Sequence, residues 1–244
     1  MIPSKFLSKI GIHELEIEGV KVKACHVTDM NSSVLEEKIT QLKASVDESR
    51  PVVGVDVKGT LTFDDEICHR TLWFDEEDMG VHISDLLILF AGNCCLVINL
   101  THLSLFPDSL VSFLADKNIC FIGTQLKARN ISRLHSCAFP DFNNLSLSNV
   151  VEVRDLATSV LKKSNLSDRG LQALDNEVRN TASSAAASSD SCPQPDSKAS
   201  VLAKERVYWK ARAFSDEEMK YVIHDAHKCY VIGDKLLGIV DAVN

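Results

Sequence analysis

Two charged side chains follow what the sequence indicates is a buried strand. The segment VVGVDVKG, residues 52–59, begins with small and apolar residues typical of a core strand. Asp56 and Lys58 come next, two positions apart, and side chains at that spacing share one face of a strand. Buried acids and bases are tolerated only with partners, so the question is which groups lie opposite Asp56 and Lys58.

A second pair of polar residues lies near the C-terminus. Tyr221 and Asp225 are four positions apart in a segment with helical spacing of apolar residues, so both project from one face about one turn apart. If this helix packs against the strand that carries Asp56, two carboxylates meet above the sheet. Paired acids are what divalent-metal phosphoryl chemistry requires. Spacing alone favours the simpler alternative, in which Asp225 faces solvent.

Histidines and cysteines are the other candidate metal ligands. His224, His227 and Cys229 lie in the same C-terminal segment, but no second cluster with zinc-ligand spacing accompanies them. We therefore interpret them as ordinary helix-face side chains. The eight cysteines include no CxxC pair, and Cys94 and Cys95 are adjacent on an apolar strand, where they point to opposite faces. Reduced thiols, as in the nucleus or cytoplasm, are the simplest interpretation.

The elements that must position these residues alternate between strands and helices. Residues 13–19 and 20–27 alternate in hydropathy and predict a hairpin with Gly19 near its turn. We expect further strands over residues 52–58, 86–91, 94–98 and 119–122. We expect helices over residues 32–46, from Pro107 and Asp108 onward, through Lys127 and Arg133, over 153–161 and 171–178, and after the capping box of Ser215 and Glu218. This order predicts a mixed sheet covered on both faces.

Composition limits the classes of protein to which this chain can belong. A chain of 244 residues, 45% hydrophobic and 25% charged, suits an ordinary globular protein with one large domain or two small ones. The first residues lack the apolar core of a signal peptide, and Gly92 and Asn93 interrupt the longest apolar stretch, so no membrane span is expected. The net charge of −8 argues against nucleic-acid binding over the whole surface but leaves a local basic groove open. Residues from 181 to about 200 are low in complexity and predict a flexible internal loop.

Four blocks carry a family resemblance. They read, in order, VVGVDVKG, CCLVINLTHLSLFPDSLVSFLADKNICFIGTQLKARNISRL, DLATSVLKKSNLSDRGLQALDNEV and WKARAFSDEEMKYVIHDAHKCYVIGDKLL. Together they resemble the Werner-type 3′-to-5′ exonucleases of the DEDD superfamily, DEDDy subgroup, and especially its short plant members. The resemblance implies an α/β fold, an RNase H-like mixed β-sheet flanked by helices. Residues 51–244 would form the exonuclease-like domain, and residues 1–50 would add an N-terminal hairpin and helix to it.

The family's active site has four carboxylates, two metal ions, Mg²⁺ or Mn²⁺, and a tyrosine that orients the attacking water. By this resemblance Asp56, Tyr221 and Asp225 match the family's residues and are the candidate catalytic residues. Asp56 and Asp225 would be the remnant of the metal site. The last block is the most specific, because Tyr221, Asp225 and Ala226 reproduce its Tyr-x-x-x-Asp-Ala pattern.

Two of the family's four acids are replaced by bases. Lys58 stands where the second acid belongs, and Arg129 where the third belongs, with Asn130 the choice if the register slips by one. The four positions therefore sum to −1 +1 +1 −1, which is zero. Two cations about 3.5 to 4 Å apart repel strongly and need surrounding carboxylates, so we expect no pair of Mg²⁺ or Mn²⁺ ions here. We expect Lys58 and Arg129 to pair with Asp56 and Asp225.

Three functions follow from this resemblance. The first is a nucleic-acid-binding protein, for DNA or RNA, whose metal-dependent phosphodiester hydrolysis is lost or strongly reduced. Its candidate phosphate-binding residues are Lys58, Lys127 and Arg129. The second is an active metal-dependent 3′-5′ exonuclease that uses Asp56, Tyr221 and Asp225. The third is a non-catalytic interaction module for a protein partner or an active relative, with residues 181–200 as a tether.

Overall fold

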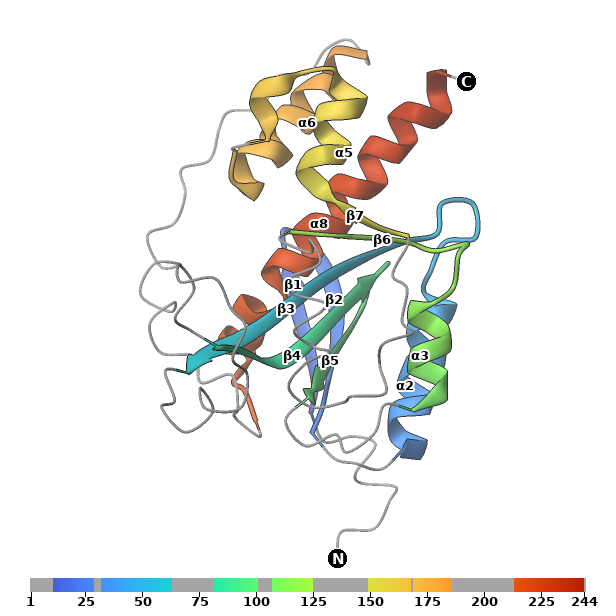
Figure 1. The fold of residues 1–244 in the computed structure, drawn as a ribbon, viewed down its shortest axis with the longest axis vertical. Helices are drawn as coiled ribbons and strands as arrows, with labels where there is room; N and C mark the ends of the chain where they lie inside the picture. Colours follow the sequence, from blue (N-terminus) through green and yellow to red (C-terminus); the bar gives the residue numbers. More distant parts are fainter. Residues whose placement is uncertain are drawn as a thin grey trace, which may run out of the picture.

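Seven strands form one mixed sheet with helices on both of its faces (Figure 1). The computed structural model describes residues 11–28, 32–62, 81–100, 107–124, 149–167, 169–185 and 213–243. The strands are β1 (Ile12–Ile17), β2 (Val20–Val27), β3 (Val52–Thr62), β4 (Val81–Ala91), β5 (Cys94–Asn99), β6 (Cys120–Gly123) and β7 (Val150–Glu152). Their spatial order is β1-β2-β5-β4-β3-β6-β7. This confirms the predicted mixed α/β sheet.

The strands divide into an antiparallel meander and parallel additions. β3, β4 and β5 follow one another antiparallel, and β1 pairs antiparallel with β2. β2 joins β5 in parallel, while β6 and then β7 extend the sheet in parallel on the far side of β3. β3 is therefore a central strand with neighbours on both sides. Asp56 and Lys58 lie where the apolar first half of β3 ends.

Each face of the sheet has its own apolar core. The helices are α2 (Ser32–Ala44), α3 (Asp108–Leu114), α5 (Val153–Leu161), the 3-10 helix η4 (Ser164–Leu166), α6 (Leu171–Ala185) and α8 (Asp216–Val243). Figure 1 shows α2 and α3 on one side of the sheet and α8 on the other. A third cluster lies where α5 and α6 pack on α8. The sheet is thus buried on both faces, as predicted.

Turn and cap residues form the local structures that the sequence predicts. Glu18 and Gly19 join β1 to β2 with positive φ angles of 52° and 81°, as a two-residue hairpin turn requires. Gly92, with a φ of 58°, begins the turn between β4 and β5. At the start of α8, Oε2 of Glu218 accepts from the Ser215 backbone N–H at 2.8 Å, which completes the predicted capping box. Across the described ranges, no helix is both long and apolar enough to cross a membrane.

Three predicted boundaries are wrong. β3 continues past Lys58 to Thr62, and β4 begins at Val81 rather than at residue 86, because the two strands hydrogen-bond to each other beyond the apolar core. A ladder of this kind satisfies backbone groups without apolar side chains. α6 extends to Ala185, so the predicted loop at 181–200 begins as helix; its alanines favour helix. Residues 186–200, and the helix predicted through Lys127 and Arg133, lie outside the described residues.

Candidate functional site

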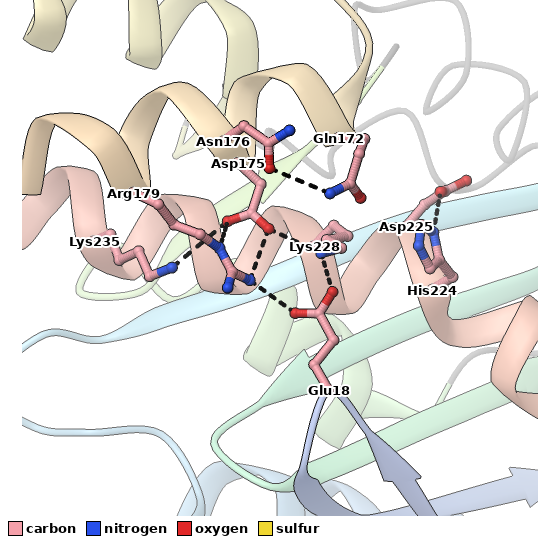
Figure 2. A network of polar contacts seen from close by, with 9 residues as sticks. All are labelled: Glu18, Gln172, Asp175, Asn176, Arg179, His224, Asp225, Lys228 and Lys235. Carbon is pink, nitrogen blue, oxygen red and sulfur yellow. Dashed lines mark hydrogen bonds and ion pairs between the residues drawn. The ribbon is translucent and has the colours of Figure 1, made fainter. Parts of the chain in front are cut away.

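β3 and α8 bring three charged side chains into contact. The ammonium Nζ of Lys58 lies 2.7 Å from Oδ2 of Asp56 on its own strand. The same ammonium donates a hydrogen bond of 2.5 Å to Oδ2 of Asp225 on α8. The other oxygen of Asp225, Oδ1, lies 3.0 Å from Nδ1 of His224 (Figure 2). Asp225 is therefore the partner that the Asp56 and Lys58 pair needs. The simpler alternative, in which the Asp225 carboxylate only faces solvent, is wrong.

A glycine allows the helix to lie directly on the strand at this point. Gly54 is on the same face of β3 as Asp56, since the two are two positions apart. A Cβ atom at Gly54 would lie 2.0 Å from the carbonyl oxygen of Ala226 and 2.9 Å from the backbone nitrogen of Tyr230. Only a residue without a side chain fits such a contact. Because Ala226 follows Asp225, this approach brings the Asp225 carboxylate within reach of Lys58.

A partly buried charge network holds α8 about one turn beyond Asp225 (Figure 2). Asp175 on α6 is fully buried and accepts hydrogen bonds of 2.9 Å from Arg179 and from Lys228, which has a side-chain exposure of 1%. Glu18, in the β1–β2 turn, binds both Lys228 and Arg179, and Lys235 lies 3.5 Å from Asp175. The network thus connects the β1–β2 hairpin and α6 to α8. Its buried residue on α8, Lys228, comes three positions after Asp225.

The sequence patterns do not predict this network, although one signal for it is present. Asp175 lies on the apolar face of α6, at helical spacing from Leu171 and from the buried Val178 and next to the buried Leu174. An acid at a core position of a helix needs a buried cation. Arg179, four positions further along α6, could have been chosen from helical spacing. Lys228 and Glu18 could not, because Lys228 is 53 positions from Asp175 and 210 positions from Glu18.

Burial and charge act differently on the two carboxylates. Burial raises the pKa of Asp56, and the Asp225 charge adds to this, against the opposing effect of Lys58. Burial also works to raise the pKa of Asp225, but the His224 hydrogen bond and the Lys58 charge outweigh it and hold that pKa well below its usual value. The two acids raise the pKa of Lys58 despite its burial. The ammonium therefore stays protonated, with Asp225 as its ionised partner.

Asp56 makes a second contact within its own strand. Its Oδ1 accepts a hydrogen bond of 2.8 Å from the backbone N–H of Val57. Its Oδ2 lies 2.7 Å from the Lys58 ammonium as an ion pair. The side chain of Asp56 is only 9% exposed, so the nearby ammonium supplies most of the compensation for burying this carboxylate.

The other candidate residues are placed less closely. Tyr221 is partly buried one turn before Asp225, and its pKa is raised by burial and by the charges of Asp225 and Asp56, with Lys58 opposing. Tyr221 thus lies near the same three charges. Lys127, Arg129 and Asn130 lie outside the described residues, so their predicted roles stay predictions.

The metal pair that the resemblance implies does not fit these donors. The carboxylates of Asp56 and Asp225 already share one ammonium, which lies within 2.7 Å of both. In the part of the chain that the structure describes, no three His, Cys, Asp or Glu side chains converge to hold a metal ion. His227 and Cys229 are buried in the apolar interior while His224 is exposed, so these three do not converge either.

Comparisons with known proteins place the fold. No family model and no curated protein matches the chain. Among solved structures, Escherichia coli RNase D, an exoribonuclease involved in structured RNA processing, aligns at 13% identity with a TM-score of 0.54, over 89% of this chain and 45% of RNase D. The catalytic core of RRP6 from Trypanosoma brucei aligns at 13% identity with a TM-score of 0.56, over 97% of this chain and 52% of that one.

A third likeness is looser, and the two better ones show the fold. The EXD2 exonuclease domain, in a crystal soaked in Mn and GMP, aligns at 18% identity with a TM-score of only 0.40, over 88% of this chain and 91% of that one. This chain spans about half the length of the RNase D and RRP6 structures. Its fold is the α/β fold of the RNase H-like exonucleases.

Proposed function

We propose that this chain is a degenerate Werner-type, DEDDy member of the 3′-5′ exonuclease group. In this proposal it binds DNA or RNA in the nucleus or cytoplasm and has lost most or all metal-dependent phosphodiester hydrolysis. The single observation that carries the proposal is the position of the Lys58 ammonium, which bridges the carboxylates of Asp56 and Asp225.

The chemistry explains why one lysine has so large an effect. Metal ions in such sites generate the nucleophile, neutralise the phosphate and stabilise the leaving oxygen. An ammonium carries a single charge, has no open coordination position and cannot lower the pKa of a bound water as a divalent ion does. The contacts of Lys58 with Asp56 and Asp225 thus use the remaining acids to neutralise a fixed cation rather than to bind a metal.

The same contacts bear on how a nucleic acid would bind. The Lys58 ammonium lies against two carboxylates and its side chain is 16% exposed, so a phosphate would have to compete with both acids for it. Lys127 and Arg129 are therefore the better candidates for phosphate contacts. The fold supports this proposal because RNase D, which shares it, is an exoribonuclease.

A nuclease assay tests the loss of hydrolysis. The substrate is a 3′-recessed DNA duplex, and in parallel a single-stranded RNA, labelled so that nucleotides released from the 3′ end are counted in Mg²⁺ or Mn²⁺. We expect the wild-type protein to release no more product than the matched Asp225→Asn variant. Release by the wild type that Asp225→Asn abolishes would instead support the active exonuclease that uses Asp56, Tyr221 and Asp225.

Fluorescence anisotropy with the same oligonucleotides tests binding. We expect Lys127→Ala and Arg129→Ala to weaken binding similarly for different sequences and to reduce its salt dependence, because phosphate contacts release counterions without reading bases. Lys162→Ala, at an exposed position after α5, is the control for a general loss of positive charge. Equal losses for all three variants would contradict a binding role specific to Lys127 and Arg129.

One observation favours a second candidate, the protein-interaction module. Four carboxylates are exposed near the start of α8: Asp216 and Glu217 on the helix, and Glu14 and Glu16 on β1. Lys23 and Lys21 of β2 lie opposite Glu14 and Glu16, while Lys220 and His13 contact Glu217 and Asp216, so this surface carries both signs of charge. A mixed-charge surface suits a complementary protein surface better than a phosphate backbone. If no oligonucleotide binds, pull-downs with and without residues 181–200 test this candidate, and identical partners in both would argue against the tether.

A further inference from the structure

Lys58 connects two acids that belong to different elements of the fold. Its ammonium contacts Asp56 on β3 and Asp225 on α8, at 2.7 Å and 2.5 Å. Removing that charge would leave two carboxylates facing each other, with one of them 9% exposed, and like charges at such a site raise each other's pKa and cost stability. The cation is therefore required wherever both acids are ionised.

The backbone fixes this arrangement, so the acids cannot simply move apart. Gly54 holds the Ala226 carbonyl against β3, and the buried Lys228 ties the next turn of α8 to Asp175. The Asp56 carboxylate is held in turn by the Val57 backbone N–H. The two carboxylates thus form a rigid pair whose charge must be balanced by a group between them.

We propose that the Lys58 ammonium is a built-in cation that both replaces and excludes a divalent ion, so that the fold of this protein is stable without metal. The corollary is that removing the ammonium turns Asp56 and Asp225 into a site for a single Mg²⁺ or Mn²⁺. Two carboxylates supplemented by water are a donor set that such hard cations accept. The inference rests on the proposed loss of metal binding but is measured by stability, not by nucleotide release.

Lys58→Ala is the informative variant because it removes the charge and leaves room for a hydrated ion. Thermal unfolding of the full chain is compared in EDTA and in millimolar Mn²⁺ or Mg²⁺. We expect the Tm of the wild type to be the same in both. We expect Lys58→Ala to have a lower Tm in EDTA and to regain about 5 °C with the metal, the rise that a ligand well above its Kd gives a chain of this size.

A matched double variant separates this site from nonspecific effects of the ion. Lys58→Ala with Asp225→Asn keeps the space but lacks one carboxylate, so its Tm should not respond to the metal. Titration of Mn²⁺, followed by the loss of the free-ion signal in electron paramagnetic resonance, should show one equivalent bound to Lys58→Ala and none to the wild type or the double variant. Lys58→Met, which keeps the aliphatic stem, reports how much of the loss in EDTA comes from packing.

The outcomes are distinct. A wild-type Tm that rises with Mn²⁺, or Mn²⁺ bound by the wild type, overturns the inference because Lys58 then does not exclude the ion. A Lys58→Ala protein that stays destabilised or unfolded at saturating metal overturns it as well, because the acids then form no cation site. Metal-dependent nucleotide release by the wild type that Asp225→Asn abolishes refutes the proposed function and the inference together, whereas Mn²⁺ binding or a raised Tm without nucleotide release overturns the inference alone.

Discussion

Gly54 on β3 and Ala226 on α8 approach so closely that a Cβ on the glycine would lie 2.0 Å from the alanine's carbonyl oxygen. No real Cβ tolerates that distance, so the helix can lie on the strand only because residue 54 has no side chain. Asp225 precedes Ala226, and Asp56 lies two residues after Gly54 on the same face. The contact between two backbones thus sets the distance between the two acids.

Gly54→Ala should destabilise the protein strongly. The added methyl group forces α8 off β3 or distorts the strand, and overpacking of this kind costs about 1 to 3 kcal/mol, or more where backbone is the obstacle. Urea unfolding followed by circular dichroism measures it. Gly170→Ala is the matched control, because a Cβ there has no described atom within 4 Å and should change the free energy of unfolding little. Equal effects of the two substitutions would contradict the close contact.

Asp175→Ala should be among the most damaging single substitutions. It leaves the ammonium of Lys228, 1% exposed, with only the partly exposed Glu18 carboxylate as a partner. Breaking a buried ion pair from one side costs about 3 to 5 kcal/mol, and because Glu18 remains we expect the lower end of that range. The double variant Asp175→Leu with Lys228→Met should be much less unstable, since it removes both charges. Urea unfolding measures all of these, with Lys220→Ala, from an exposed pair with Glu217, as a control expected to change stability by less than about 1 kcal/mol. A double variant as unstable as Asp175→Ala would contradict this account.

Stability should fall as the pH is lowered from about 6.5 to about 4. Burial lowers the pKa of both His26 and His227 to about 4, from an ordinary value of 6.5. The unfolded chain therefore binds protons in this window that the folded chain does not, so the loss begins below 6.5 and is complete near 4. A shift of this size makes each histidine contribute on the order of 3 kcal/mol.

His26→Phe and His227→Phe test this dependence. Each ring packs on an aromatic neighbour, Phe214 or Phe90, and each has a ring nitrogen without a hydrogen-bond partner among the described residues. A phenylalanine should therefore be accommodated and should flatten the decline in the free energy of unfolding between pH 6.5 and 4 by roughly half. At pH 8 the variants should be about as stable as the wild type. An unchanged slope would show that these histidines are not the groups that titrate.

Local patterns in the sequence were sufficient for most of the fold. The hairpin around Gly19 and the capping box of Ser215 and Glu218 depend on neighbouring residues only, and both form as predicted. The lengths of β3 and β4 depend on more than neighbouring residues, because the two strands extend by pairing with each other beyond the apolar run. Which strands pair is a property of the whole fold, so hydropathy along the sequence does not predict it.

The candidate site likewise has residues that the sequence predicts and contacts that only the fold determines. Asp56, Lys58 and Asp225 could be named from a strand pattern, a helix spacing and a family resemblance, and the structure brings them together. The role of Gly54 could not be seen, since it depends on which backbone lies opposite. The buried partner of Asp175 could not be seen either, because Lys228 lies 53 positions away, although Arg179 is within reach on the same helix.

The two acids that share Lys58 should respond unequally to neutralisation. Burial raises the pKa of Asp56, so the fold disfavours its ionised form, whereas the fold favours the ionised form of Asp225, whose pKa is lowered by His224 and Lys58 despite its burial. Asp225→Asn should therefore lower the free energy of unfolding at pH 7 more than Asp56→Asn, although Asp56 is the more deeply buried of the two. The stability that Asp225 contributes is fully present above its unfolded pKa near 4 and is lost progressively as the pH falls from there toward its much lower folded pKa, so Asp225→Asn should begin to approach the wild type at pH 3. Urea unfolding at pH 7 and pH 3 measures both, and a larger loss for Asp56→Asn at pH 7 would show that Lys58 is held mainly by its own strand rather than by α8.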